Sequence, residues 1–280
     1  MDPDKAAAAA TKRAATLAAK KKATKKVYDL SKFTNERDEA FRTKCGEFFN
    51  KLHEHPESLE KDHPAMKTEL DTMKHNAINE GEEEEEDVPE GQGSANKASS
   101  QEACFAVEAR DTGFKFLRPG VTPTDGLWFA YQLGGSQAKL DFQLLSVSGD
   151  KIDKVNVDLK HSNNTTIKLN DGWFWEDTIY IISFTRGPGR KKGGAKKQVC
   201  LVANGSDIAT PERTAMRTTF VEAMNKIKTE FKGDGIYKPY PRKADSYSCN
   251  EFTDEFVKDR LTKTLAWLAP TVPAPHSPPA

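Results

Sequence analysis

The sequence predicts an α+β protein. Its main part is expected to be an antiparallel β-sandwich or jelly-roll-like domain with C-terminal helices, preceded by a small helical segment and a disordered basic N-terminal arm. Between residues 104 and 208 there are about eight short runs rich in β-branched and aromatic residues, separated by turn signals, which is typical of sandwiches and barrels. Two segments nearer the C-terminus repeat apolar residues at helical spacing. Charges are segregated along the 280 residues, although they sum to zero.

This segregation divides the chain into five expected parts. From the N-terminus they are a disordered basic arm, a helical segment, an acidic flexible linker, a β-rich domain with two helices and a disordered Pro/Ala tail, at 1–27, 28–79, 80–103, 104–269 and 270–280. The arm and the tail have almost no large apolar residue, so neither can bury a core. The linker contains an acidic run, Glu82 to Asp87, whose self-repulsion keeps it extended.

Residues 33–76 are expected to be helical because their apolar residues recur at roughly helical spacing. Thr34 or Asn35 is the expected N-cap. Pro56 and Pro64 interrupt the pattern, so a second, shorter helix is expected after the break. We interpret this part as a surface-exposed helical hairpin or as a docking element for another molecule.

The strands expected in the β-rich domain are bounded by Gly, Pro, Asn, Asp or Ser. They are 104–109, 113–117, 127–133, 140–146, 152–159, 165–169, 179–185 and 199–203. Val155, Val157 and Leu159 alternate with polar residues, which is the period of a half-buried strand. Residues 211–232 and 251–268 are the expected helices, and the apolar stripe of the first, with Phe220 and Met224, is expected to pack on the sheet.

The stretch from Thr178 to Val202 is typical of two antiparallel strands joined by a basic loop. Its glycine spacing matches a P-loop, but Ala195 stands where the phosphate-binding lysine is needed and a strand follows, which excludes that motif. A flexible cationic hairpin tip that contacts nucleic acid remains the favoured interpretation. The loop has six positive charges and no negative one: Arg186, Arg190, Lys191, Lys192, Lys196 and Lys197.

The N-terminal arm supplies a second group of cations. We expect it to contact the backbone of RNA or DNA, chiefly through Lys20, Lys21, Lys22, Lys25 and Lys26. The alternative for both basic segments is a solvated stretch that keeps the protein soluble. The acidic linker is a solvated spacer or, alternatively, an internal competitor for these cations.

Catalysis and metal binding have weaker support in the sequence. The histidines near Cys45 match no zinc-binding spacing. Between Cys104 and Cys249 only His161 is available to activate a nucleophile. A paired-carboxylate site stays open, with candidates Asp125, Asp141, Asp171, Glu176 and Asp177. We expect no metal and no cofactor.

Two aromatic clusters lie beside predicted turns, at 127–129 and 173–175. Stacking on bases or sugars is one interpretation. Core packing is favoured, because a domain of this size needs large buried residues. Strand alternation would bury Phe174 and expose Trp173 and Trp175, or the reverse.

The sequence therefore predicts a non-enzymatic structural protein that binds nucleic acid and self-associates through its β-domain. This order of parts resembles that of viral coat proteins, a likeness of arrangement alone. The alternatives are a nuclear or cytosolic adaptor whose β-domain binds a protein or glycan and, third, an enzyme with a carboxylate-based site. With no membrane span or export signal and with scattered cysteines, we expect a reduced, non-secreted protein of the cytoplasm, nucleus or, for a coat protein, virion.

Overall fold

The computed structural model describes residues 30–78, 98–132, 140–162, 166–169, 174–186, 197–208, 211–230 and 245–269. The strands within these ranges are β1 Thr34–Asn35, β2 Lys115–Leu117, β3 Gly126–Tyr131, β4 Phe142–Ser148, β5 Lys151–Ser162, β6 Thr166–Leu169, β7 Thr178–Arg186, β8 Lys197–Asn204 and β9 Asp245–Ser248. The helices are α2 Glu39–Glu54, α3 Pro64–Ile78, α4 Ser100–Asp111, α5 Gly205–Ile208, α6 Pro211–Glu230 and α7 Asp254–Leu268, with 3₁₀ turns η1 Pro56–Glu60 and η2 Cys249–Glu251.

The described strands form a seven-stranded sheet in the order β2-β3-β4-β5-β7-β8, with β1 beside β5, and a two-stranded sheet of β6 and β9. The β3-β4-β5 meander and the β7-β8 hairpin are antiparallel. The pairs β1-β5, β2-β3 and β5-β7 are parallel. The protein is therefore mixed α/β with an open sheet, and the expected antiparallel sandwich or jelly-roll is not confirmed. The parallel pairing of β5 with β7 requires the chain to cross over between Ser162 and Thr178.

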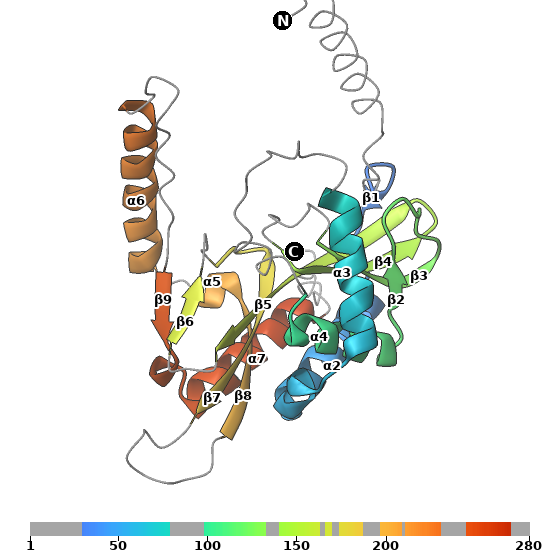
Figure 1. Ribbon diagram of the computed structural model, residues 1–280, viewed down its shortest axis with the longest axis horizontal. Coiled ribbons are helices and arrows are strands. Elements are labelled where there is room, and N and C mark those ends of the chain that lie inside the picture. Colours follow the sequence, from blue (N-terminus) through green and yellow to red (C-terminus); the bar gives the residue numbers. More distant parts are fainter. Residues whose placement is uncertain are drawn as a thin grey trace, which may run out of the picture.

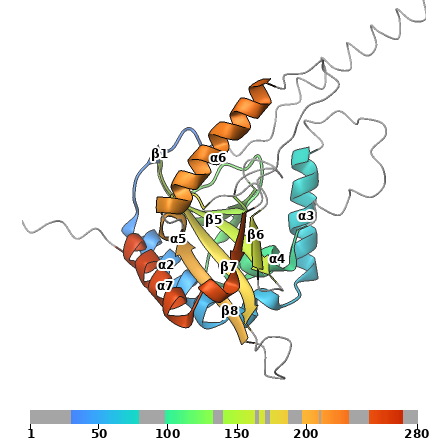
Figure 2. The ribbon, with the colours of Figure 1, turned by 90° about the vertical axis from the view of Figure 1, so that its left-hand side faces the viewer.

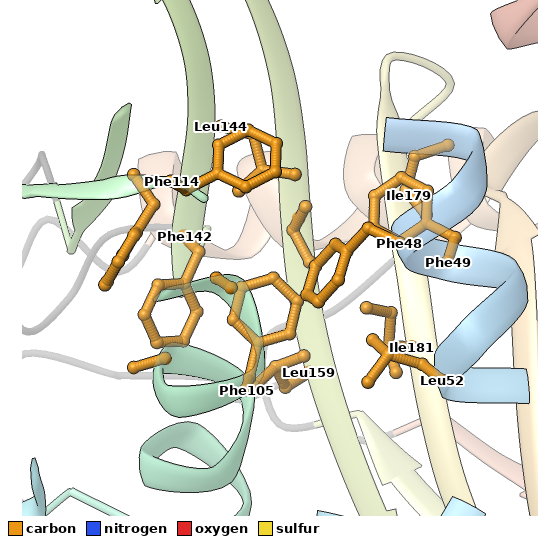
Figure 3. Close-up of a cluster of buried hydrophobic side chains, with 14 of the residues drawn as sticks. Phe48, Phe49, Leu52, Phe105, Phe114, Phe142, Leu144, Leu159, Ile179 and Ile181 are labelled. Atoms are coloured by element: carbon orange, nitrogen blue, oxygen red, sulfur yellow. The ribbon is translucent and has the colours of Figure 1, made fainter. Parts of the chain in front are cut away.

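One face of the sheet is covered by α2, α3 and α4 (Figure 1). Phe48 of α2 lies 5.2 Å from Phe105 of α4, between ring centroids, and Phe105 lies 4.6 Å from Phe142 of β4. Figure 3 shows these rings meeting above the strands. All three are fully buried. The core is thus continuous across the expected boundary at 80–103, and α2 is part of it rather than of a surface-exposed hairpin.

The opposite face of the sheet is covered in two places. Over β7 and β8, Phe174 and Phe252 pack on Tyr180 and Phe184, and the Phe174 and Tyr180 rings meet edge to face at 4.7 Å. Over β3 and β4, the first described residues of the chain, including Phe33, pack on a smaller apolar group. Polar residues of β4 and β5 lie between these two clusters.

The outer edge of β8 is closed by helices rather than by another strand. α7 lies along β8 and beside α2 (Figure 2). The hydroxyl of Thr264 accepts a hydrogen bond from the Asn204 amide at 3.1 Å, and His53 Nδ1 lies 3.0 Å from the Cys200 carbonyl. Such cover prevents a second chain from pairing with the edge strand.

Every strand expected between residues 113 and 203 is present, with ends shifted by a few residues. The expected strand at 104–109 is wrong, because these residues lie in α4. The Ser99 hydroxyl accepts the Glu102 amide at 3.1 Å and the Glu102 carboxylate accepts the Ser99 amide, a capping box that starts a helix. The expected N-cap of α2 is also wrong: Thr34 and Asn35 form β1, and Asp38 caps the helix.

Helix α6 lies where the sequence predicts it, but its apolar stripe does not pack on the sheet. Met216 is 72% exposed, Phe220 45% and Ile227 39%. The helix projects from the body of the protein in both views (Figures 1 and 2). The expectation that it belongs to the core is therefore wrong. Neither α6 nor any other described helix has the length and apolar character needed to cross a lipid bilayer.

Candidate functional site

The basic hairpin predicted from the sequence is present as β7 and β8. The two strands pair from Ile179 opposite Asn204 to Arg186 opposite Lys197. Buried β-branched and aromatic side chains hold this ladder in the sheet. The cations Arg190, Lys191, Lys192 and Lys196 of the connecting segment lie outside the described residues.

The two cations at the base of the hairpin are held by one carboxylate. Asp254, in the first turn of α7, lies 2.5 Å from Arg186 Nη1 and 3.6 Å from Lys197 Nζ. A second nitrogen of Arg186 donates to the Phe252 carbonyl. The hydrogen bond and the charge of Arg186 lower the pKa of Asp254 below its usual value. Arg186 and Lys197 are thus engaged within the protein by a contact that the sequence did not predict.

The N-terminal arm is joined to the described chain at the opposite end of β5 from the hairpin. Its cations, Lys20, Lys21, Lys22, Lys25 and Lys26, lie outside the described residues. The described chain begins at Leu30, next to β1, and β1 pairs with the start of β5. The hairpin leaves the sheet beyond the other end of β5, where Ser162 pairs with Phe184. A 12-residue strand separates the two attachment points by about 40 Å, at 3.3 Å per residue.

A carboxyl pair at the end of the β4-β5 ladder was missed by the sequence analysis. Asp141 was among the candidate carboxylates, but its partner, Asp158, was not. The ladder continues outward from Phe142 opposite Val157, which places Asp141 opposite Asp158. The sequence could have indicated this pair, because counting residues outward along both strands from the turn at Gly149-Asp150 places Asp141 opposite Asp158.

The carboxyl pair has one neighbouring cation. Lys160 Nζ donates to Asp158 Oδ1 at 2.6 Å, and Asp158 is hydrogen-bonded to Asp141. Burial, followed by the charge of Asp158, raises the pKa of Asp141 to about 7. Two hydrogen-bonded carboxyls require a proton between them. Such a pair can exchange that proton near neutral pH.

The remaining candidate carboxylates are dispersed. Asp125 Oδ1 accepts the Gly149 amide at 2.9 Å, Asp177 accepts from the Asn156 side chain at 3.2 Å, and Glu176 is exposed. Asp171 lies outside the described residues.

A shallow hollow of about 660 Å³ lies at the other end of the sheet from the hairpin, lined by Lys32, Phe33, Thr122, Pro123, Thr124, Asp125, Gly149 and Asp150.

His161 has a serine partner, but the serine is buried. Ser183 Oγ lies 2.8 Å from His161 Nδ1 and accepts a hydrogen bond from Gln101 Nε2 at 3.1 Å. Ser183 is fully buried, so a substrate cannot reach it as a nucleophile. The contact joins α4 to the ends of β5 and β7, so its role is structural.

The helix N-terminus nearest these strand ends offers no anion site. The capping box engages the backbone amides of Ser99 and Glu102 and places the Glu102 carboxylate at this end of the helix. The neighbouring Tyr131 hydroxyl also donates to Glu102, at 2.8 Å.

The cysteines and the aromatic clusters have structural roles where they are described. The four cysteines are buried thiols, and burial raises their pKa values, to about 12 for Cys200. The described residues contain no group of three or more His, Cys, Asp or Glu side chains suited to a metal ion. Phe174 is buried and Trp175 is half-buried against the same cluster, but both precede β7 and so do not follow strand alternation; Trp173 lies outside the described residues. Trp128 Nε1 donates to the Thr124 carbonyl at 2.7 Å.

Comparison with protein-family models, with curated proteins and with solved structures gave no match for this chain.

Proposed function

We propose that this protein binds the phosphate backbone of nucleic acid, RNA or DNA, through the loop between β7 and β8, with the N-terminal arm as a second contact. The main support is the register that pairs Arg186 with Lys197. This register attaches residues 187–196 to both strands of a hairpin fixed in the core. Those residues contain four cations and no acidic side chain.

The environment of the hairpin favours backbone contacts over base recognition. Its tip is rich in glycine and has no aromatic residue that could stack on a base. Cationic side chains on such a segment contact phosphates, which position a protein without reading sequence. Because Asp254 holds Arg186 and Lys197, the number of available cations falls from six to four.

The four tip cations are expected to contribute about −3.6 to the log–log slope of duplex affinity against salt if each neutralises one phosphate, and contacts of the arm add to it. Replacing Arg190, Lys191, Lys192 and Lys196 with alanine should remove most of this contribution, equally on unrelated sequences. Fluorescence anisotropy over a salt series measures it. The control variant Lys115→Ala/Lys151→Ala removes exposed lysines away from the hairpin and should leave the slope unchanged. Undetectable binding to RNA and DNA at low salt would refute the proposal.

Neutralising Asp254 should tighten binding. Asp254→Asn removes the charge that holds Arg186 and Lys197, so these cations become available beside the tip. The salt slope should then steepen by about one to two units. Glu255→Gln, the next residue on the same helix, is the matched control. An unchanged slope in Asp254→Asn would show that the base of the hairpin does not contact phosphate.

The order of parts along the chain also supports a coat- or nucleoprotein-like structural role. Such a role requires self-association in addition to phosphate binding. Size-exclusion chromatography with absorbance at two wavelengths reports particle size and co-purifying nucleic acid together. A monomer that binds nucleic acid would retain the binding function and exclude the assembly role.

A further inference from the structure

The inference concerns the carboxyl pair, Asp141 and Asp158, and its position in the sheet. Asp141 connects three segments. Its carboxyl Oδ2 accepts the Leu159 amide at 2.8 Å, its side chain is hydrogen-bonded to Asp158, and its carbonyl accepts the Gln132 amide at 2.9 Å. The end of β3, the start of β4 and the middle of β5 are therefore joined through one residue.

The pair holds one proton, and the surrounding groups indicate where it lies. Lys160 Nζ donates a charge-assisted hydrogen bond to Asp158 at 2.6 Å, so Asp158 is the acceptor in that contact. Asp141 therefore holds the proton and donates a hydrogen bond to Asp158. The pKa of Asp141 is raised to about 7, first by burial and then by the charge of Asp158, which agrees with a proton on Asp141.

The two tyrosines that interact with the pair do not change charge in the same pH range. Tyr131 on β3 and Tyr180 on β7 interact electrostatically with Asp141 and Asp158 respectively. Burial raises the pKa of both tyrosines, so both stay neutral. Lys160 is the cation that acts on Asp141. The charge of the group thus depends on the single proton shared by the two aspartates.

The segment that Asp141 holds is strained. Gln132 directly follows β3 and has φ 46°, in the left-handed region that a residue with a side chain rarely adopts. Its Oε1 atom is buried and has no hydrogen-bond partner among the described residues. The contact between its amide and the Asp141 carbonyl therefore holds a conformation that tends to relax when the contact is lost.

We propose that Asp141 and Asp158 form a proton-dependent contact that fastens the start of β4, and with it Gln132 just after β3, to β5, and that this contact opens as the pH rises through neutrality. Without the shared proton, two adjacent carboxylates repel each other at a partly buried position. Separating the strand ends restores water to both.

The direction of the pH effect follows from proton linkage. The fastened form binds the proton more tightly than the open form, in which Asp141 has an ordinary carboxyl pKa. The contact is therefore fully favoured below that ordinary value, and its advantage is lost as the pH rises through the pKa of the fastened form. Between about pH 5.5 and pH 8.5, linkage allows the open fraction to rise by roughly thirtyfold.

Backbone amide hydrogen exchange, followed by NMR on the full chain and corrected for intrinsic rates, tests the proposal. The amides of Leu159 and Gln132 should lose protection by at least about tenfold over that pH range. The amide of Val155, in the middle of the ladder, should not, which separates local opening from global unfolding. Asp141→Asn keeps the hydrogen bonds without a titrating proton and should abolish the pH dependence. Asp177→Asn, an exposed aspartate that contacts β5, should retain it.

Two results would overturn the proposal. One is protection of Leu159 and Gln132 that does not change with pH in the wild-type protein. The other is the same pH dependence in Asp141→Asn. If that variant does not fold, the carboxyl ¹³C shift of Asp141 in the wild-type protein decides, because titration near pH 4, the ordinary value, would exclude a shared proton.

Discussion

Replacing Arg42 with methionine is expected to lower the free energy of unfolding by about 3–5 kcal/mol, because it leaves a buried carboxylate without its partner. Arg42 of α2 donates two hydrogen bonds to Asp153 of β5, at 2.7 and 2.6 Å. The two residues are 8% and 2% exposed. Asp153 also accepts the amide of Asp38, the residue that caps α2, at 3.0 Å. This pair fixes the helix to the sheet.

The matched control for Arg42 lies on the same helix. Lys44 makes an exposed ion pair with Glu47, so Lys44→Met should change stability by less than about 0.5 kcal/mol. The double variant Arg42→Met/Asp153→Leu should recover part of the loss, since no charge remains buried. Urea denaturation measures all three. Equal midpoints for Arg42→Met and Lys44→Met would contradict the assigned role of the pair.

Replacing Phe105 with alanine is expected to cost about 3–5 kcal/mol, because the cavity forms at the centre of the main core. Phe105 contacts Phe48 of α2 and Phe142 of β4 and is fully buried. It lies just after the acidic linker, on the helix that the sequence analysis expected to be a strand. A large loss would show that α4 joins the helical segment to the sheet in one cooperative core.

Phe220 provides the contrast for this measurement. The sequence predicts that the apolar stripe of α6 packs in the core, whereas Phe220 is 45% exposed in the structure. Phe220→Ala should therefore change the free energy of unfolding by less than about 1 kcal/mol. Denaturant midpoints of the two phenylalanine variants compare them directly. A small effect at Phe105 together with a large one at Phe220 would reverse our description of the core.

The candidate site was predictable from the sequence only in its local parts. The basic loop is a property of composition, and the strands on either side of it are recognisable from β-branched residues, so the β7-β8 hairpin was predicted correctly. The contact of Asp254 with Arg186 and Lys197 was not. Asp254 lies in another helix, and no periodic pattern relates it to the hairpin. The pairing of Asp141 with Asp158 was not predicted but could have been, because a tight turn joins their two strands and fixes which residues face each other.

The sequence by itself determined the strands from 113 to 203 and the existence of α2, α6 and α7, because residue periodicity and turn residues act over a few neighbours. It did not determine α4, which is buried on nearly every side and so lacks the polar face that marks an amphipathic helix. Only the tertiary structure decided the parallel pairing of β5 with β7, the burial of Arg42 against Asp153 and the exposure of α6. Each of these depends on which distant segment covers a surface, and that choice is made by the packing of the whole chain.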